Sequence, residues 1–303
     1  MAWLVFVIFS YFLLAIASVG DRFFLTGPLK NPKVYTFYVG AASLLAAPFI
    51  FPFVGVRPDF FTLLLGLAAG LFWVGALWAY FLAIAKSEVS RVVPATGAFI
   101  SILTLLGAYF TSREMLLPGE IFAFALLLIG GVLIVAPKIS MSYFFHEHTL
   151  PFIVFAAFLF TLVLFLVKAI FLRTPFAEGL LLILIGRGLA SLFFLIFSDV
   201  KKAVFAERVG LAKQVAFLFI CFQSAGGLGS ALQIFSISLA KISQLSLINA
   251  LEGTRYLFLF IFVWLAARWR PELLKEEMAG AVLRQKLIAG VIIISGIAIL
   301  VLA

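Results

Sequence analysis

The sequence has few charged residues and few of the residues that usually perform catalysis. Charged side chains make up 12% of its 303 residues, against about 25% in an average soluble domain. It contains two histidines and one cysteine, Cys221, which excludes an intrachain disulfide. So little charge cannot cover the surface of a water-soluble globule. The composition therefore excludes a soluble enzyme, a disordered chain and a DNA-binding domain.

Apolar side chains are abundant instead. Hydrophobic residues account for 65% of the chain, and the mean hydropathy is +1.24. They form continuous runs near the ~20 residues that an apolar helix needs to cross a bilayer. The sequence therefore predicts an all-α polytopic membrane protein with ten transmembrane helices. We expect these helices at residues 2–20, 34–54, 60–84, 89–111, 119–137, 150–172, 177–198, 214–240, 244–267 and 286–303.

The net charge of +9 comes from basic residues that lie mainly in the short connections between the apolar runs. In these positions Lys and Arg contact lipid headgroups and set the orientation of the chain. We therefore expect a lipid bilayer as a partner, and no nucleic acid. Most of the basic residues follow odd-numbered runs, so the positive-inside rule places both termini outside the cytoplasm.

Alignment of the sequence with itself indicates an internal repeat. Shifts of 148, 155 and 166 residues superimpose identical residues: 40 and 42–44 on 188 and 190–192, 76–77 on 231–232, 85–86 on 240–241, 95 on 250, and 130 on 296. Each shift joins one run to the fifth run after it. Because five is odd, the second unit crosses the membrane in the opposite sense. We predict two inverted five-helix repeats, residues 1–138 and 150–303, joined by a loop at 139–149, an architecture typical of transporters.

The hairpin from Ala76 to Ser90 resembles a signature of the drug/metabolite transporter superfamily, in its EamA-like branch. It has a helix rich in small residues, an Ala-Lys-Ser turn at 85–87, and a next helix that opens with Pro94. The Gly-Glu pair that precedes the fifth helix in that family is present as Gly119-Glu120, whereas Gln285-Lys286 precedes the tenth.

This resemblance covers the whole chain. It implies a ten-helix transporter with cytoplasmic termini, which disagrees with the positive-inside rule, so the orientation stays open. The superfamily carries amino acids, nucleotide sugars, sugar phosphates and drugs, so the resemblance does not define the substrate.

Charged residues inside the apolar runs are the strongest pointer to function, because each costs about 2.5–3.5 kcal/mol at the centre of a membrane helix. Arg187 lies midway along the seventh run and Lys168 near the end of the sixth. Glu252 and Arg255 lie in the middle of the ninth. Their counterparts in the first repeat are all uncharged. We therefore expect the polar site to be built mainly from the second repeat.

Helical periodicity adds a set of polar and aromatic side chains to this site. They share faces of the third, eighth and ninth runs. We predict a substrate cavity lined by Lys168, Arg187, Arg255, Gln223, Gln233, Asn249, Tyr256, Trp73, Trp78 and Tyr80.

Structural roles are the alternative for several of these residues. The aromatic residues can pack, and Gln233 and Asn249 can join helices by hydrogen bonds. Glu252 and Arg255 can form an ion pair with each other, and Lys168 can extend to the membrane interface or pair with Asp21.

Three basic residues against one acid favour a substrate with an anionic or carboxylate group. Glu252 is the only carboxylate that we expect at mid-membrane, so it is the candidate proton carrier if transport is coupled to protons. We predict a secondary transporter of a small metabolite, working by alternating access in the inner or plasma membrane, as a monomer or a homodimer.

We expect no enzymatic activity, cofactor or metal. No Walker loop or nucleotide-binding fingerprint occurs in a suitable context, and His146-Glu147-His148 reads as part of the solvated loop between the repeats. The alternative is a membrane-embedded lipid-handling protein or enzyme whose basic cluster holds a lipid phosphate. A channel is disfavoured, because it would carry like residues at symmetric positions.

Overall fold

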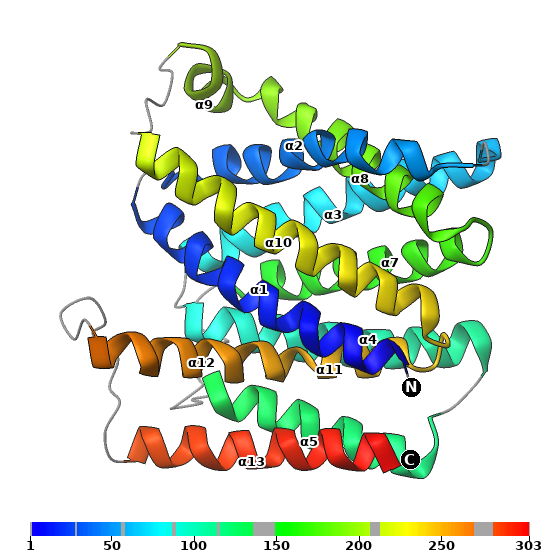
Figure 1. Cartoon of the computed structure of the whole chain (residues 1–303), viewed down its shortest axis with the longest axis vertical. Coiled ribbons are helices and arrows are strands. Elements are labelled where there is room, and N and C mark those ends of the chain that lie inside the picture. The colour runs from blue at the N-terminus through cyan, green and yellow to red at the C-terminus, as the bar shows by residue number, and fades with distance from the viewer. Residues whose placement is uncertain are drawn as a thin grey trace.

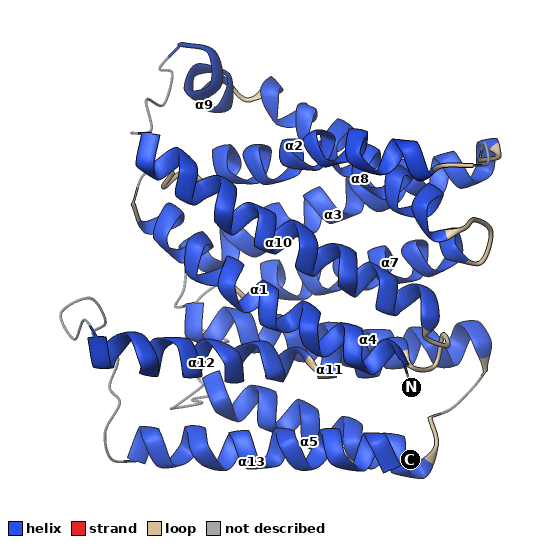
Figure 2. Ribbon diagram, in the orientation of Figure 1, coloured by secondary structure: helices blue, strands red, loops and turns tan. Residues whose placement is uncertain are grey.

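The computed structural model of the chain describes residues 2–27, 29–55, 58–86, 89–113, 116–135, 149–206, 213–269 and 281–302. These residues fold almost entirely into helices, with no strand among them (Figures 1 and 2). The all-α prediction is therefore confirmed. The predicted loop between the repeats, with His146-Glu147-His148, lies outside the described residues except for Thr149.

The long helices follow one another with short connections. In chain order they are α1 (Ala2–Thr26), α2 (Pro32–Ile50), α3 (Phe60–Lys86), α4 (Val89–Ser112), α5 (Pro118–Val135), α7 (Leu150–Phe171), α8 (Phe176–Leu192), α10 (Lys213–Leu239), α11 (Leu245–Ala250), α12 (Glu252–Trp269) and α13 (Ala281–Leu302). Short segments follow α2 and α8: η1 (Phe51–Phe53), η2 (Phe193–Ile196), α9 (Ser198–Lys201) and η3 (Lys202–Ala206).

Within the part of the chain that the structure describes, nine helical stretches are long and apolar enough to cross a membrane. They coincide with nine of the ten predicted runs, and α11 and α12 together make one of them. The fifth run is the exception, since its apolar stretch Pro118–Ile134 is shorter. The chain is a multi-pass membrane protein.

The outside of the bundle carries large apolar side chains, as contact with lipid requires. Leu45, Phe49 and Phe110 are 75%, 77% and 78% exposed. A soluble monomer rarely exposes apolar patches of more than a few hundred Å². Cys221, on α10, is also exposed.

The helices run side by side, and the chain reverses direction at two ends of the bundle (Figure 1). Both termini lie at one end, which we call the N/C end; the α1–α2 connection lies at the other, which we call the far end. The most extensive packing joins α1 to α10, α3 to both α7 and α8, α5 to α13, and α2 to α8. Each helix of residues 2–135 thus packs against helices of residues 149–302.

Glycine lets α3 and α8 come into backbone contact at a crossing next to Arg187. A Cβ atom on Gly70 would lie 2.0 Å from the carbonyl carbon of Gly186, and one on Gly186 would lie 2.1 Å from the carbonyl oxygen of Gly66. No side chain fits in such a crossing, which is typical of small residues at membrane helix interfaces. The α3–α8 crossing is therefore closed tightly.

The ninth predicted run, 244–267, is not one continuous helix. It breaks at Leu251, which separates α11 from α12. The hydroxyl of Tyr11 on α1 donates a hydrogen bond of 2.7 Å to the carbonyl of Ile248, in the last turn before the break. Backbone groups freed within a membrane need such a partner, because lipid offers none. Glu252 is therefore the first residue of a helix that begins inside the bundle.

The α3–α8 crossing leads to a stability prediction. We expect Gly186→Ala to lower stability by about 1–3 kcal/mol, because the new methyl group meets backbone rather than a movable side chain. Thermal unfolding of the purified protein in detergent measures the loss. Gly227→Ala on α10 is the control: a Cβ there meets nothing within 4 Å, so this variant should be neutral or slightly stabilised. Equal unfolding temperatures for the two variants would contradict the crossing.

Candidate functional site

Arg187 is a buried guanidinium without a counter-ion. It lies on α8 and is 7% exposed. Its Nη1 donates a hydrogen bond of 3.0 Å to the hydroxyl of Ser230 on α10. The guanidinium carbon lies 4.4 Å from the ring centre of Trp73 on α3, a cation–π arrangement. Arg187 and Trp73, both predicted site residues, are thus brought together.

The rest of the Arg187 guanidinium makes no bond with the residues that the structure describes. Nε is buried and has no hydrogen-bond partner, and Nη2 donates to no described residue. No described carboxylate contacts it. Burial of an unpaired charge in an apolar medium is costly, and orphaned charged donors are rare in native structures. The free Nε–Nη2 edge of Arg187 is therefore suited to bind an anionic group.

Arg255 and Glu252 form the predicted ion pair. Nη1 of Arg255 lies 3.3 Å from Oε1 of Glu252, one turn back at the start of α12. The start of a helix favours a carboxylate, because its unpaired backbone N–H groups carry partial positive charge. The Nε of Arg255 also donates a hydrogen bond of 2.9 Å to the hydroxyl of Ser18 on α1.

A second carboxylate, Asp21, belongs to the same site, although the sequence suggests it only as an alternative partner of Lys168. It accepts a hydrogen bond from the hydroxyl of Tyr35 on α2. That hydroxyl in turn accepts one of 3.1 Å from Nε2 of Gln223 on α10. Asp21 lies one turn after Ser18 on α1 and is close enough to Arg255 for electrostatic interaction. We name Asp21, Glu252 and Arg255 the acidic centre.

Asp21 is thus a second carboxylate within the candidate spans, although it lies near the end of its span and not at mid-membrane as Glu252 is expected to. The first predicted run ended at Gly20, because Asp21 and Arg22 interrupt its hydropathy. In the structure α1 continues to Thr26, and the candidate span Ala2–Leu25 includes Asp21. The signal that could have found Asp21 is the apolar stretch Phe23–Leu25 just after the charged pair.

Tyrosine hydroxyls gather around the acidic centre. Tyr80 on α3 is close enough to Arg255, Glu252 and Asp21 for electrostatic interaction. The hydroxyl of Tyr256 is buried and has no hydrogen-bond partner among the described residues. With Tyr11 and Tyr35, these make four of the seven tyrosines in a chain with 37 phenylalanines. Tyrosine is thus placed where a hydroxyl is needed, since phenylalanine supplies the packing elsewhere.

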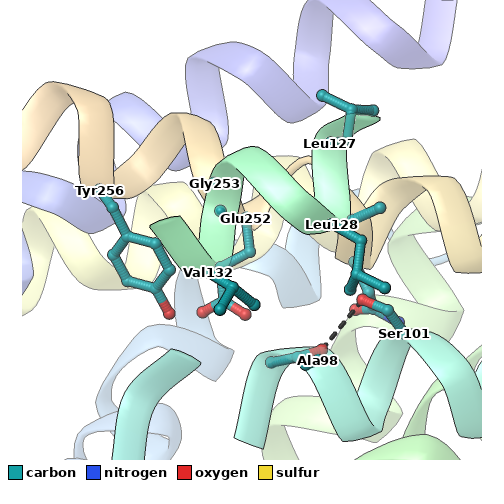
Figure 3. Close-up of a pocket in the computed structure, with 12 residues that line it drawn as sticks. Ala98, Ser101, Leu127, Leu128, Val132, Glu252, Gly253 and Tyr256 are labelled. Atoms are coloured by element: carbon teal, nitrogen blue, oxygen red, sulfur yellow. Dashed lines mark hydrogen bonds between the residues drawn. The ribbon is translucent and has the colours of Figure 1, made fainter. Parts of the chain in front are cut away.

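A small cavity lies beside Glu252 and Tyr256, and Figure 3 shows the hydroxyl of Tyr256 directed toward the carboxylate of Glu252. The centre of a water molecule can occupy about 20 Å³ there, which is room for about one water. A Cβ atom on Gly97 would lie 3.0 Å from Oε2 of Glu252. The wall of the cavity is formed by Gly97, Ala98, Ser101, Leu127, Leu128, Gly131, Val132, Asn249, Ala250, Glu252, Gly253 and Tyr256.

Lys168 is placed away from these residues. Its Nζ donates hydrogen bonds of 3.3 Å and 3.0 Å to the carbonyls of Ile237 and Ser238, at the last turn of α10. A lysine there satisfies carbonyls that have no partner within their own helix. Lys168 lies toward the N/C end and Asp21 toward the far end, so the suggested pairing of the two is wrong.

The other predicted residues divide between the site and structural roles. Gln233 donates a hydrogen bond of 3.2 Å to the Tyr11 hydroxyl that caps the helix break. Asn249 donates a hydrogen bond of 3.1 Å to Thr104 and joins α11 to α4.

Trp78 packs against Phe194 and Phe197. This packing places its indole on another face of α3 from Trp73. Gln223 reaches the acidic centre through Tyr35.

The charge balance differs from the sequence prediction. Without Lys168 and with Asp21, the site holds two guanidinium groups and two carboxylates, and its formal net charge is zero. The charges are not evenly distributed. Arg187 has no acid beside it, whereas Arg255 lies beside two. The prediction of three basic residues against one acid is therefore replaced by a positive and a negative centre.

At the far end, outside the spans, Asn31 and Lys33 hold Asp199. Nδ2 of Asn31 donates a hydrogen bond of 2.9 Å to Oδ2 of Asp199, and Nζ of Lys33 lies 3.6 Å from the same oxygen. The hydrogen bond from Asn31, with the charge of Lys33, keeps the pKa of Asp199 below its ordinary value. The contact is thus complete at neutral pH and is lost only as the pH falls through that lowered pKa.

No protein-family model and no curated protein matches this sequence. A solved structure described only as "Crystal structure of protein" is similar in fold, with a TM-score of 0.69 and 17% sequence identity over 99% of this chain and 98% of that chain. At this identity the similarity concerns the fold alone.

The helix break leads to a second stability prediction. Tyr11→Phe removes the hydroxyl that serves both the Ile248 carbonyl and the Gln233 amide, so we expect a loss of about 1–3 kcal/mol. Thermal unfolding in detergent measures it. Tyr109→Phe is the matched control, because Tyr109 is 48% exposed on the outer surface. If Tyr11→Phe unfolds at the temperature of the wild type, the hydroxyl does not stabilise the break.

Proposed function

We propose that the chain is a secondary transporter that moves a small metabolite with a carboxylate group across the inner or plasma membrane by alternating access. We further propose that it belongs to the EamA-like branch of the drug/metabolite transporter superfamily, with α5 and the α11–α12 pair completing ten spans in two inverted repeats. The observation that carries the proposal is the buried Arg187 guanidinium, which lies near the middle of α8 without a counter-ion.

Helix packing supports the repeat assignment. Adding five to each span number pairs α1 with α7, α2 with α8, α3 with α10, and α5 with α13. The α1–α10 contact then has α7–α3 as its equivalent, and both are among the most extensive in the bundle. The α2–α8 and α5–α13 contacts each join a helix to its own equivalent in the other repeat, and these contacts are extensive too. This pattern is expected of two intertwined repeats with opposite orientation.

One pair of equivalent crossings is strongly unequal, which supports alternating access. The α3–α8 crossing is closed by glycine. Its equivalent, α10–α2, lies near the far end and packs much less. There the repeat alignment replaces Gly70 with Ala225 and Gly186 with Tyr38, and a hydrogen bond from Gln223 to Tyr35 joins the helices. We infer a state in which the α3–α8 crossing is closed and the α10–α2 crossing is loose, which exchanges with a state of the reverse arrangement.

A carboxylate matches the free part of Arg187. Two parallel hydrogen bonds from a guanidinium edge to a carboxylate are short, strong and directional. Ser230 and the Trp73 ring hold the guanidinium plane in place, so the Nε–Nη2 edge is oriented before the ligand arrives. Such preorganisation reduces the entropy cost of binding.

The lipid-handling alternative is weaker on the same contacts. It needs a cluster of cations to hold a phosphate. Lys168 is bound to carbonyls of α10, and Arg255 is paired with Glu252. Arg187 alone is left, and one guanidinium suits a carboxylate.

The first functional prediction concerns Arg187. Uptake of labelled carboxylate metabolites into proteoliposomes should fall at least about tenfold in Arg187→Gln, since a hydrogen bond to a charged group is worth about 1.5–3 kcal/mol. Arg173→Gln is the matched control, because Arg173 lies over Phe61 at the N/C end, outside the site. Lys168→Met should lower thermal stability and leave substrate affinity unchanged. Normal uptake by folded Arg187→Gln protein would refute the proposal.

The second functional prediction concerns Glu252 as the proton carrier. If a substrate draws Arg255 away, Glu252 loses its counter-ion, and a buried carboxylate without a partner binds a proton. Glu252→Gln should then keep substrate binding but lose uptake driven by a pH gradient, while Asp199→Asn should keep both. A purely structural pair predicts the opposite: stability falls by a few kcal/mol and the remaining uptake still responds to pH.

A further inference from the structure

We infer that the cavity beside Glu252 binds one water molecule between Oε2 of Glu252 and the hydroxyl of Tyr256, and that Glu252 exchanges its proton with this water. The carboxylate then takes up its proton at the oxygen that does not contact Arg255. The role of the water rests on the proposed transport function, in which Glu252 is the proton carrier.

The two carboxylate oxygens of Glu252 have different surroundings. Oε1 lies 3.3 Å from Nη1 of Arg255. Oε2 lies toward α4, 3.0 Å from the position that a Cβ atom on Gly97 would take. The guanidinium is therefore bound at one oxygen, and the other oxygen borders the cavity between α4, α5 and the α11–α12 break.

The hydroxyl of Tyr256 is a second polar group at the same cavity. Tyr256 is only 8% exposed, and its hydroxyl has no hydrogen-bond partner among the described residues. Figure 3 shows this hydroxyl directed toward the Glu252 carboxylate. It lies 3.9 Å from the same Cβ position on Gly97. Both oxygens thus border one small space, and a hydrogen-bonding group placed there would satisfy the buried hydroxyl.

The size and lining of the cavity suit a single water. The centre of a water molecule can occupy about 20 Å³ there, which is about one probe sphere. Glu252 and Tyr256 offer it an acceptor and a hydroxyl, and Ser101 and Asn249 add polar side chains to the wall. Glu252 is the only charged residue of the wall, so a divalent cation would find too few ligands.

The position of the water agrees with the proposed repeats. The alignment that superimposes Ala95 on Ala250 also superimposes Gly97 on Glu252. A residue and its counterpart can touch only near the axis that relates two repeats. The contact between Gly97 and Glu252 therefore places the water near this axis, where it stays in place while the halves rock around a central site.

On the cavity side of Glu252, water is the group that can pass a proton. No residue that α4 or α5 contributes to the wall is titratable. A proton can reach a carboxylate directly or through one water. The other titratable groups around Glu252 are Tyr11 and Asp21 of α1, Tyr80 of α3, Arg255 and Tyr256 of α12 itself and, further along α12, Lys286 of α13.

Protonation at Oε2 requires no movement of Arg255. A hydronium ion formed at the water position transfers one proton to Oε2, which leaves a neutral water and a neutral carboxylic acid. The same water accepts the proton when Glu252 releases it. If a substrate draws Arg255 away, the loss of the counter-ion favours proton uptake.

Infrared spectroscopy of the purified protein in detergent tests for the water without a substrate. Water enriched in heavy oxygen should shift the O–H band of one bound water in the wild type. The band of the protonated Glu252 carboxyl is identified by its absence in Glu252→Gln. Gly97→Ala puts a methyl group in the space of the water. It should remove the water band and move the carboxyl band to higher frequency, because the acid loses a hydrogen-bond partner.

Light-induced release of a caged proton tests the exchange. The carboxyl band of Glu252 should rise at least about tenfold more slowly in Gly97→Ala than in the wild type, because the transfer depends on the water. Gly227→Ala is the matched control, since its methyl group meets nothing within 4 Å, and it should react at the wild-type rate.

The outcomes separate this inference from the proposed function. Absence of the water band in the wild type, or equal rates in Gly97→Ala and Gly227→Ala, would overturn the inference and leave the proposed transporter in place. A water band and slowed exchange in a protein that takes up no labelled carboxylate would support the water and remove the transport function. If Gly97→Ala unfolds at a lower temperature than Gly227→Ala, Tyr256→Phe replaces it, because it keeps the ring and removes one partner of the water; an unchanged rate there would also contradict the inference.

Discussion

Every polar group inside this bundle must find its partner within the protein, because the hydrocarbon of a bilayer offers none. Tyr11 caps the carbonyl at the helix break, Lys168 caps the end of α10, and Tyr35 binds Asp21. Against this background the few unsatisfied groups stand out. The Nε of Arg187, the hydroxyl of Tyr256 and the indole Nε1 of Trp78 are buried without hydrogen-bond partners among the described residues, and the first two belong to the candidate site.

The site lies between the two halves of the chain rather than within one. The second half supplies Arg187, Ser230, Glu252 and Arg255, and the first half supplies Trp73, Ser18 and Asp21. A relative movement of the halves would therefore change the contacts of both centres. In the described part of the chain, the two halves pack tightly at the α3–α8 crossing and much less at the α10–α2 crossing.

Much of the fold is predictable from the sequence, because a membrane span needs only length and continuous hydrophobicity. Arg187, Glu252 and Arg255 are predictable as site residues for the same reason, since charge in a span is conspicuous. The break at Leu251 is not, because no proline marks it and its partner is the distant Tyr11 hydroxyl. The structural role of Lys168 is not predictable, because its hydrogen-bond acceptors are backbone carbonyls, which every residue carries. Asp21 is not predictable as a site residue, because it lies where hydropathy first falls and the sequence suggests it only as a partner of Lys168.

The single cysteine gives the molecule an intrinsic attachment point. Cys221 is exposed on α10, two residues from Gln223 and on the helix that joins both charge centres. A thiol-reactive fluorophore or spin label would therefore attach to the native chain at one position, with no background from other thiols. Its spectrum would report the environment of α10 directly, and so would show whether the α10–α2 crossing changes in the way that the proposed alternating access requires.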